Sequence, residues 1–128
     1  MAGMEIAIRV GDAANYGFHS NGYHATGVVS HFSSGLVAGR LLGLSCEQMV
    51  SAQGIVVSTA TASREFMSDG AWNKRLHPGW GAVAGITAAY LAKAGLSCLV
   101  LEGQKAVGGN TATDEVTLPG FRHDTCST

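Results

Sequence analysis

A basic and aromatic stretch at residues 69–80 holds the side chains best suited to chemistry in a chain otherwise rich in Gly, Ala, Ser, Val and Leu. Lys74, Arg75 and His77 lie close together in it. Pro78 follows, and a proline suits the first turn of a helix because it lacks an N–H. Since a proline also favours an extended residue before it, His77 is expected to be extended. The stretch predicts a basic segment at a helix N-terminus, where partial positive charge and free N–H groups favour a carboxylate or phosphate.

A second interpretation of the same stretch is a solvated basic turn with Trp72 and Trp80 as core anchors. Local chemistry does not choose between the two interpretations. Asp69 is the carboxylate nearest the basic residues. It could orient Lys74, although a turn-forming Asp is the commoner role.

His24 stands, like His77, just before an expected helix N-terminus. The positive end of a helix disfavours imidazolium, so a histidine there tends to be neutral near pH 7. A neutral imidazole can accept a proton or donate a hydrogen bond to a carboxylate. If the two helix ends meet, His24, His77 and Lys74 form a pocket for a substrate with several carboxylates. A purely structural role for His24 is the alternative, because nothing in the local sequence brings these ends together.

The other histidines give weaker signals. His31 is interpreted as a helix-surface or core residue, His19 as an exposed loop residue, and His123 lies in the tail. No His-x-x-x-His pair has a nearby Glu, and the cysteines are isolated, so neither a metal nor a cofactor is predicted. The cysteines are three in number and widely spaced, which is typical of free thiols in a reducing compartment.

Composition excludes several classes of protein. Charged residues make up 13% of the chain, about half the usual ~25%, so much of the surface is expected to lie against something else. The net charge of -1 and the lack of a basic stripe argue against nucleic-acid binding. No apolar run is long enough to span a membrane, and the N-terminus lacks a signal-peptide layout. A cytoplasmic location is expected, or a mitochondrial one in a eukaryotic cell.

Apolar residues recur at helical spacing in four segments, which predicts helices at residues 3–14, 27–42, 46–61 and 79–94. Ser45 and Gln48 match a capping box before the third segment. Gly43 and Gly95 suit positions just past helix ends. The fourth segment has an apolar side made by Val83, Ile86, Tyr90 and Leu91. Its glycines weaken an isolated helix by up to ~1 kcal/mol each, and close helix–helix approach is the expected compensation.

The sequence therefore predicts an all-α fold, a helical bundle. After residue 103 the composition changes to Gly, Thr and Asp with little apolar periodicity. Such a segment is expected to be a flexible tail. The predicted division is a helical domain at 1–103 and a flexible tail at 104–128.

Four motifs, taken in order along the chain, resemble the MmgE/PrpD family: residues 22–27, 38–44, 53–55 and 69–80. The resemblance runs from about residue 3 to residue 103, and Lys-Arg-Leu-His-Pro-Gly-Trp at 74–80 is its most specific part. The family includes 2-methylcitrate dehydratases, cis-aconitate decarboxylases and iminodisuccinate epimerases. It implies an all-helical large domain and a lyase or isomerase that needs neither metal nor cofactor.

By the same resemblance, His24 and Lys74 correspond to active-site residues of the family. His24 would exchange a proton with the substrate, and Lys74 would hold a carboxylate and stabilise developing negative charge. Arg75 and His77 are the candidate substrate-binding residues beside them. Family members are several times longer, so this chain is expected to be a fragment of the helical domain, without the upstream helices or the second domain.

The function expected from this resemblance is that of a lyase, a dehydratase or decarboxylase. It would act on a small di- or tricarboxylate by proton transfer next to a carboxylate, impaired by truncation. One alternative is a catalytically inactive helical remnant or interaction module, and another is an epimerase of an iminodicarboxylate. The expected partners are the carboxylate substrate and further copies of the chain, which would associate through exposed apolar helix faces.

Overall fold

The computed structural model describes residues 1–97 together with two residue pairs further on, and the helices hold most of these residues. In chain order they are α1 (Ala2–Ala14), α2 (Gly17–Ser20), α3 (Ala25–Leu41), α4 (Cys46–Val57), α5 (Phe66–Asp69), the 3-10 helix η1 (Trp72–Arg75) and α6 (Leu76–Lys93). The pairs are β1 (Thr113–Asp114) and β2 (His123–Asp124), which pair antiparallel. The all-α prediction is confirmed.

The predicted flexible tail at 104–128 lies outside the described residues, except for β1 and β2. The division at residue 103 stays a prediction. No helix in the described part of the chain is long and apolar enough to cross a membrane.

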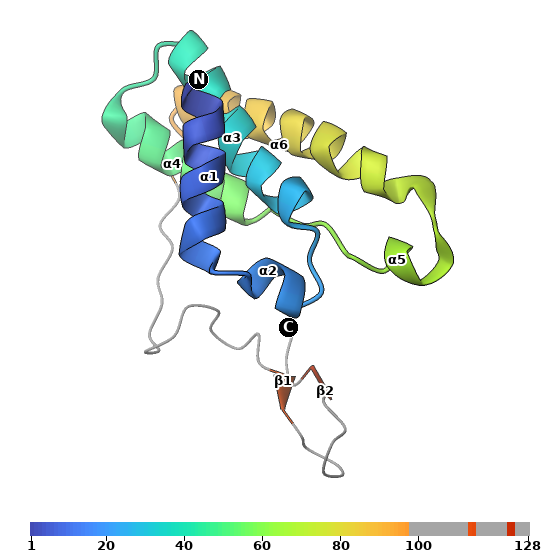
Figure 1. Cartoon of the computed structure of the whole chain (residues 1–128). Helices are drawn as coiled ribbons and strands as arrows, with labels where there is room; N and C mark the ends of the chain where they lie inside the picture. Colours follow the sequence, from blue (N-terminus) through green and yellow to red (C-terminus); the bar gives the residue numbers. More distant parts are fainter. Residues whose placement is uncertain (98–112, 115–122, 125–128) are drawn as a thin grey trace.

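The centre of the molecule is the crossing of α3 and α6, which pack against each other more extensively than any other pair of helices. In Figure 1, α1 lies against α3, and α6 runs along the side of α3 away from α1. The helix α4 packs against both α3 and α6. The first residues of α3 and α6, with α5 and η1, lie toward one end of this arrangement (Figure 1).

Small residues make the α3–α6 crossing possible. A Cβ added to Gly85 would collide with the Ser34 hydroxyl and the backbone N of Gly35. The Ser34 hydroxyl also lies 2.6 Å from the Gly81 carbonyl oxygen, as a hydrogen bond between the two helices. The prediction that glycines of the fourth segment allow close helix–helix approach is therefore confirmed for Gly81 and Gly85, whereas a Cβ at Gly79 would meet nothing within 4 Å.

The large apolar side chains of α6 do not form its packed face. Val83, Ile86 and Tyr90 are 55%, 46% and 58% exposed. Small residues form the buried face instead: Gly81, Ala84, Gly85, Ala88, Ala89 and Ala92. Because α3 and α6 approach closely, only small side chains fit between them. The apolar side that the sequence predicted for α6 therefore faces outward.

The helix termini follow local signals. Ser45 Oγ accepts a hydrogen bond from the Gln48 N–H at 3.2 Å, and the Ser45 N–H donates to Gln48 Oε1 at 3.0 Å, so the capping box is confirmed. Gly43 and Gly95 have φ angles of 68° and 93°, which favour glycine. The helix α4 ends at Val57 rather than at residue 61, because the chain turns there and runs back toward the start of α3.

Candidate active site

Two loops distant in sequence pair side by side and fix the position of His24. The His24 N–H donates to the Ala62 carbonyl oxygen at 2.7 Å. The Arg64 N–H donates to the Gly22 carbonyl oxygen at 2.8 Å. This short antiparallel pairing holds the residues before α3 against the segment that leads to α5 and η1. It brings the two regions singled out in the sequence together.

His24 and His77 meet in the folded chain. His24 is the residue before α3, in extended conformation, and only 8% of it is exposed. Its Nδ1 lies 3.1 Å from Nδ1 of His77, a hydrogen bond between residues 53 positions apart. The Phe66 ring packs edge-on against His24, with ring centroids 5.4 Å apart, and 5.9 Å from that of His77. The question that the local sequence left open is thus answered: the two helix ends converge.

His77 is helical, so the expectation of an extended residue is wrong. It is the second residue of α6, and Pro78 is the third. A proline there removes no helical hydrogen bond, because the first four N–H groups of a helix have no acceptor within it. In addition, η1 runs directly into α6, and the Leu76 N–H donates to the Asn73 carbonyl oxygen. That N–H is not free for an anion, so the case for an anion site depends on side chains.

Gly27, in the first turn of α3, allows His77 to approach. A Cβ at Gly27 would lie 2.8 Å from Cβ of His77, and it would also collide with Cβ of Ala62. Any side chain at this position would push α3 away from the start of α6. Gly27 is therefore a site residue that the sequence analysis did not identify, although it lies within the Gly-Tyr-His-Ala-Thr-Gly motif.

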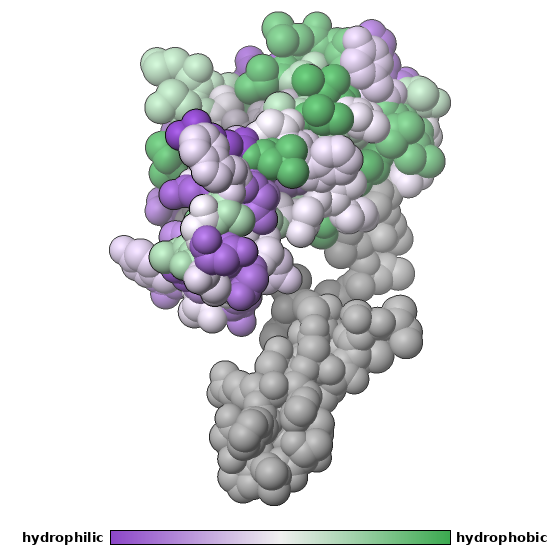
Figure 2. Space-filling model, turned by 90° about the vertical axis from the view of Figure 1, so that its right-hand side faces the viewer, coloured by the Kyte–Doolittle hydropathy of each residue, from purple (hydrophilic) through white to green (hydrophobic). Residues whose placement is uncertain are grey.

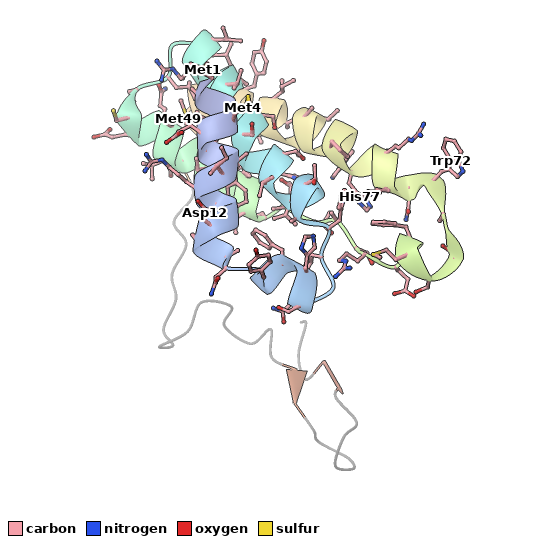
Figure 3. All side chains as sticks on the ribbon, in the orientation of Figure 1. Met1, Met4, Asp12, Met49, Trp72 and His77 are labelled. Carbon is pink, nitrogen blue, oxygen red and sulfur yellow. The ribbon has the colours of Figure 1, made fainter. Side chains whose placement is uncertain are left out.

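Lys74 lies at the edge of the histidine pair, whereas Arg75 is held elsewhere. Lys74 Nζ lies 5.6 Å from the centroid of the Phe66 ring, the same ring that packs against His24. The Arg75 guanidinium lies 4.4 Å from the ring centroid of Trp72. In Figure 3, Trp72 projects outward at the rim of the molecule, and His77 lies nearer its interior. Lys74 and Arg75 both border a depression of about 200 Å³.

The second interpretation of the basic stretch, a solvated turn with two tryptophans as core anchors, is wrong for the tryptophans. Trp72 and Trp80 are 76% and 49% exposed, so neither is a core anchor in the described part of the chain. Asp69 does not orient Lys74. Its Oδ1 accepts a hydrogen bond from the Ala71 N–H at 2.9 Å, the turn-forming role.

The surroundings of His24 favour the neutral form of its imidazole. Burial lowers the pKa of His24 from its usual 6.5, and positive charge on four neighbours lowers the pKa further: His77, Lys74, His19 and Arg64. No carboxylate is among these influences. The site is thus a cluster of histidines and cations, able to accept a proton and to attract an anion.

No described set of His, Cys, Asp or Glu side chains is grouped so as to hold a metal ion. His31, interpreted from the sequence as helix-surface or core, is fully buried. Its Nδ1 lies 2.8 Å from the Gly27 carbonyl oxygen, and its Nε2 has no hydrogen-bond partner among the described residues. Phe66 and Arg64 also belong to the site, and no local signal singles them out within an irregular segment.

The fold and the site define an all-α protein with paired imidazoles in a cationic setting. The chain belongs to the MmgE/PrpD family, because the model of the MmgE/PrpD N-terminal domain matches residues 1–114. The resemblance recognised in the motifs is confirmed by this match. Comparisons with curated proteins and with solved structures gave no match.

Proposed function

We propose that the chain carries part of the active site of an MmgE/PrpD-type lyase, a dehydratase or decarboxylase of a small di- or tricarboxylate. The observation that supports this most is the contact of His24 with His77 beside Lys74, with no carboxylate among the described residues that influence His24. Such a cluster suits a ligand with several negative charges. Family membership supports the same substrate class.

In the proposed reaction, His24 removes a proton from the carbon next to a substrate carboxylate. The neutral imidazole that burial favours is the form able to accept this proton. Lys74 binds the carboxylate and stabilises the negative charge that develops as the C–H bond breaks. In a dehydration, the C–O bond on the neighbouring carbon then breaks and the hydroxyl leaves as water after taking up a proton. In a decarboxylation no proton is removed first: the C–C bond to a carboxylate breaks, carbon dioxide leaves, and the carbon that keeps the electron pair takes up one proton from the histidine pair.

Arg75 is proposed to support the substrate beside Lys74, whereas His77, the other candidate substrate-binding residue, is in contact with His24. Arg75 borders the same depression as Lys74 and could meet a second carboxylate. An epimerase would share the first proton removal and return the proton to the other face of the carbon. A non-catalytic remnant would retain the anion site without turnover.

The test is calorimetric binding of citrate to the full chain and to two lysine variants. A charge-assisted hydrogen bond contributes about 1.5–3 kcal/mol, so Lys74→Gln is expected to weaken binding roughly 10- to 100-fold. Lys93→Gln is the matched control. It removes the same charge from the opposite end of α6, where Lys93 Nζ lies 3.3 Å from the Leu42 carbonyl oxygen. Absence of citrate binding, or equal weakening by both substitutions, would contradict the proposal.

Turnover is assayed separately with 2-methylcitrate, cis-aconitate and iminodisuccinate. The isolated chain is expected to show little or none, because an active site of this kind needs groups from several elements around one substrate. A non-catalytic remnant would give the same result in the isolated chain, so substitutions at the matching positions of a full-length relative distinguish the two. Inversion of iminodisuccinate alone would favour the epimerase.

A further inference from the structure

We infer that His77 is a positioning residue whose Nδ1 shares a single proton with Nδ1 of His24, so that the two imidazoles work as one unit. This inference builds on the proposed function for the role of His24, but the pairing itself can be tested without any ligand. The role of His77 is then to orient His24 and share its proton, and not to bind the substrate.

The 3.1 Å distance between the two Nδ1 atoms sets the proton count. An imidazole nitrogen is either a donor, when it carries a hydrogen, or an acceptor, when it does not. A hydrogen bond between two such atoms therefore needs one hydrogen in total. Two hydrogens would face each other, and none would leave two lone pairs opposed.

The surrounding groups hold the rings in this contact. His24 is fixed through its backbone hydrogen bond to Ala62, and Cβ of His77 lies against Gly27. The Phe66 ring packs against both imidazoles. These contacts favour the arrangement in which the two rings face each other.

The charged groups that influence His24 oppose a second positive charge on the pair. These groups are Lys74 in η1, His19 in α2 and Arg64 in the segment before α5. Among the described residues none of these influences is a carboxylate. A doubly protonated pair would thus have both a steric and an electrostatic conflict, and it is expected to separate.

The pairing gives His24 two neutral arrangements with different chemistry. Among the described residues, no hydrogen bond occupies Nε2 of His24, so this atom is left for a ligand. When His24 donates through Nδ1, its Nε2 is bare and can accept a proton. The Nδ1 proton can then pass to His77, which disperses the new charge over both rings. When His77 donates instead, Nε2 of His24 carries a hydrogen and can donate it to a carboxylate.

The test is nitrogen NMR of the histidine side chains across their titration range in the ligand-free chain. In the wild type, His24 and His77 are expected to titrate in two separate, mutually dependent steps. His77→Asn places a neutral amide beside His24, which should then titrate in one step with a raised pKa.

His19→Asn is the matched control, because His19 influences His24 by charge without a hydrogen bond between the two side chains. It should leave the two-step titration of the pair intact. Circular dichroism establishes that each variant is folded. Independent single-step titrations in the wild type, unchanged by His77→Asn, would overturn the inference. Loss of citrate binding alone would not, so failure of the proposed function and failure of the pairing are distinguishable.

Discussion

At the scale of single residues, His24 shows how an ordinary histidine becomes a candidate catalytic base. The pairing with residues 62–64 fixes its backbone, Phe66 shields its ring, and positive neighbours disfavour its charged form. Burial and positive neighbours raise the free energy of the protonated imidazole relative to that of the neutral one. Because this free-energy difference is absent in the unfolded chain, protonation of His24 is linked to the stability of the fold.

Acidification is expected to destabilise the chain through His24. Its pKa is lowered from 6.5 in the folded state, so below that value the unfolded chain binds more protons. The stabilising contribution is complete above pH 6.5 and is lost as the pH falls through the folded pKa. Urea titrations at several pH values should show the unfolding free energy falling more steeply for the wild type than for His24→Asn. Equal slopes would contradict the role of His24.

Substitutions at the matching positions of a full-length relative test the residue roles directly. His24→Ala and Lys74→Ala are each expected to lower kcat by at least ~100-fold, the scale of general acid–base and charge-stabilising groups. Arg75→Ala should act mainly on KM, since Arg75 borders the depression beside Lys74 and is proposed to bind a second carboxylate. Retained turnover in both of the first two variants would mean that the motifs are structural.

At the scale of elements, α3 and α6 depend on small residues where they cross. The absence of side chains at Gly81 and Gly85 lets the two backbones approach, and the Ser34 hydroxyl bonds to the Gly81 carbonyl oxygen across the interface. The same approach of the two helices brings His77 against the first turn of α3 at Gly27. The site geometry is therefore a consequence of how closely these helices pack.

Two glycine substitutions in α6 are expected to have opposite effects. Gly85→Ala would collide with Ser34 and Gly35, and overpacking of this kind costs about 1–3 kcal/mol or more. Gly79→Ala meets nothing within 4 Å, so it should stabilise the helix by up to ~1 kcal/mol through propensity. Thermal unfolding followed by circular dichroism compares the two. Equal melting temperatures would show that the crossing tolerates a methyl group.

At the scale of the whole molecule, apolar side chains remain on the surface. On α6 they form a stripe at helical spacing: Trp80, Val83, Ile86 and Tyr90. On α1, Met4 and Ile8 are 71% and 56% exposed. Figure 2 shows hydrophobic residues gathered on the upper part of the face it displays. A contiguous apolar surface of this kind favours association with another surface.

Self-association through the α6 stripe is the prediction at this scale. Light scattering on the purified chain is expected to show oligomers or precipitate. The double substitution Val83→Glu and Ile86→Glu should shift the population toward the monomer, because charges would have to be buried in any contact. Thr61→Glu adds a charge at an exposed polar residue in the loop after α4 and serves as the control. A monomeric wild type would contradict this prediction.

The sequence by itself determined the four long helices, the capping box of α4 and the family, but not α2, α5 or η1. A capping box such as Ser45 with Gln48 acts within one turn, and a glycine such as Gly43 ends a helix through its own backbone. These signals are local, so they can be read without the fold. The motifs around His24 and Lys74 likewise indicated the family before the fold was known.

Only the tertiary structure decided which residues meet and which face outward. His24 and His77 are 53 residues apart, and their contact depends on a glycine-lined helix crossing and a short loop pairing. Periodicity predicted an apolar side for α6, but the packed side is the one with the smallest side chains. Periodicity reports what a helix could bury, whereas the distance between helix axes decides what it does bury, and that distance depends on both partners.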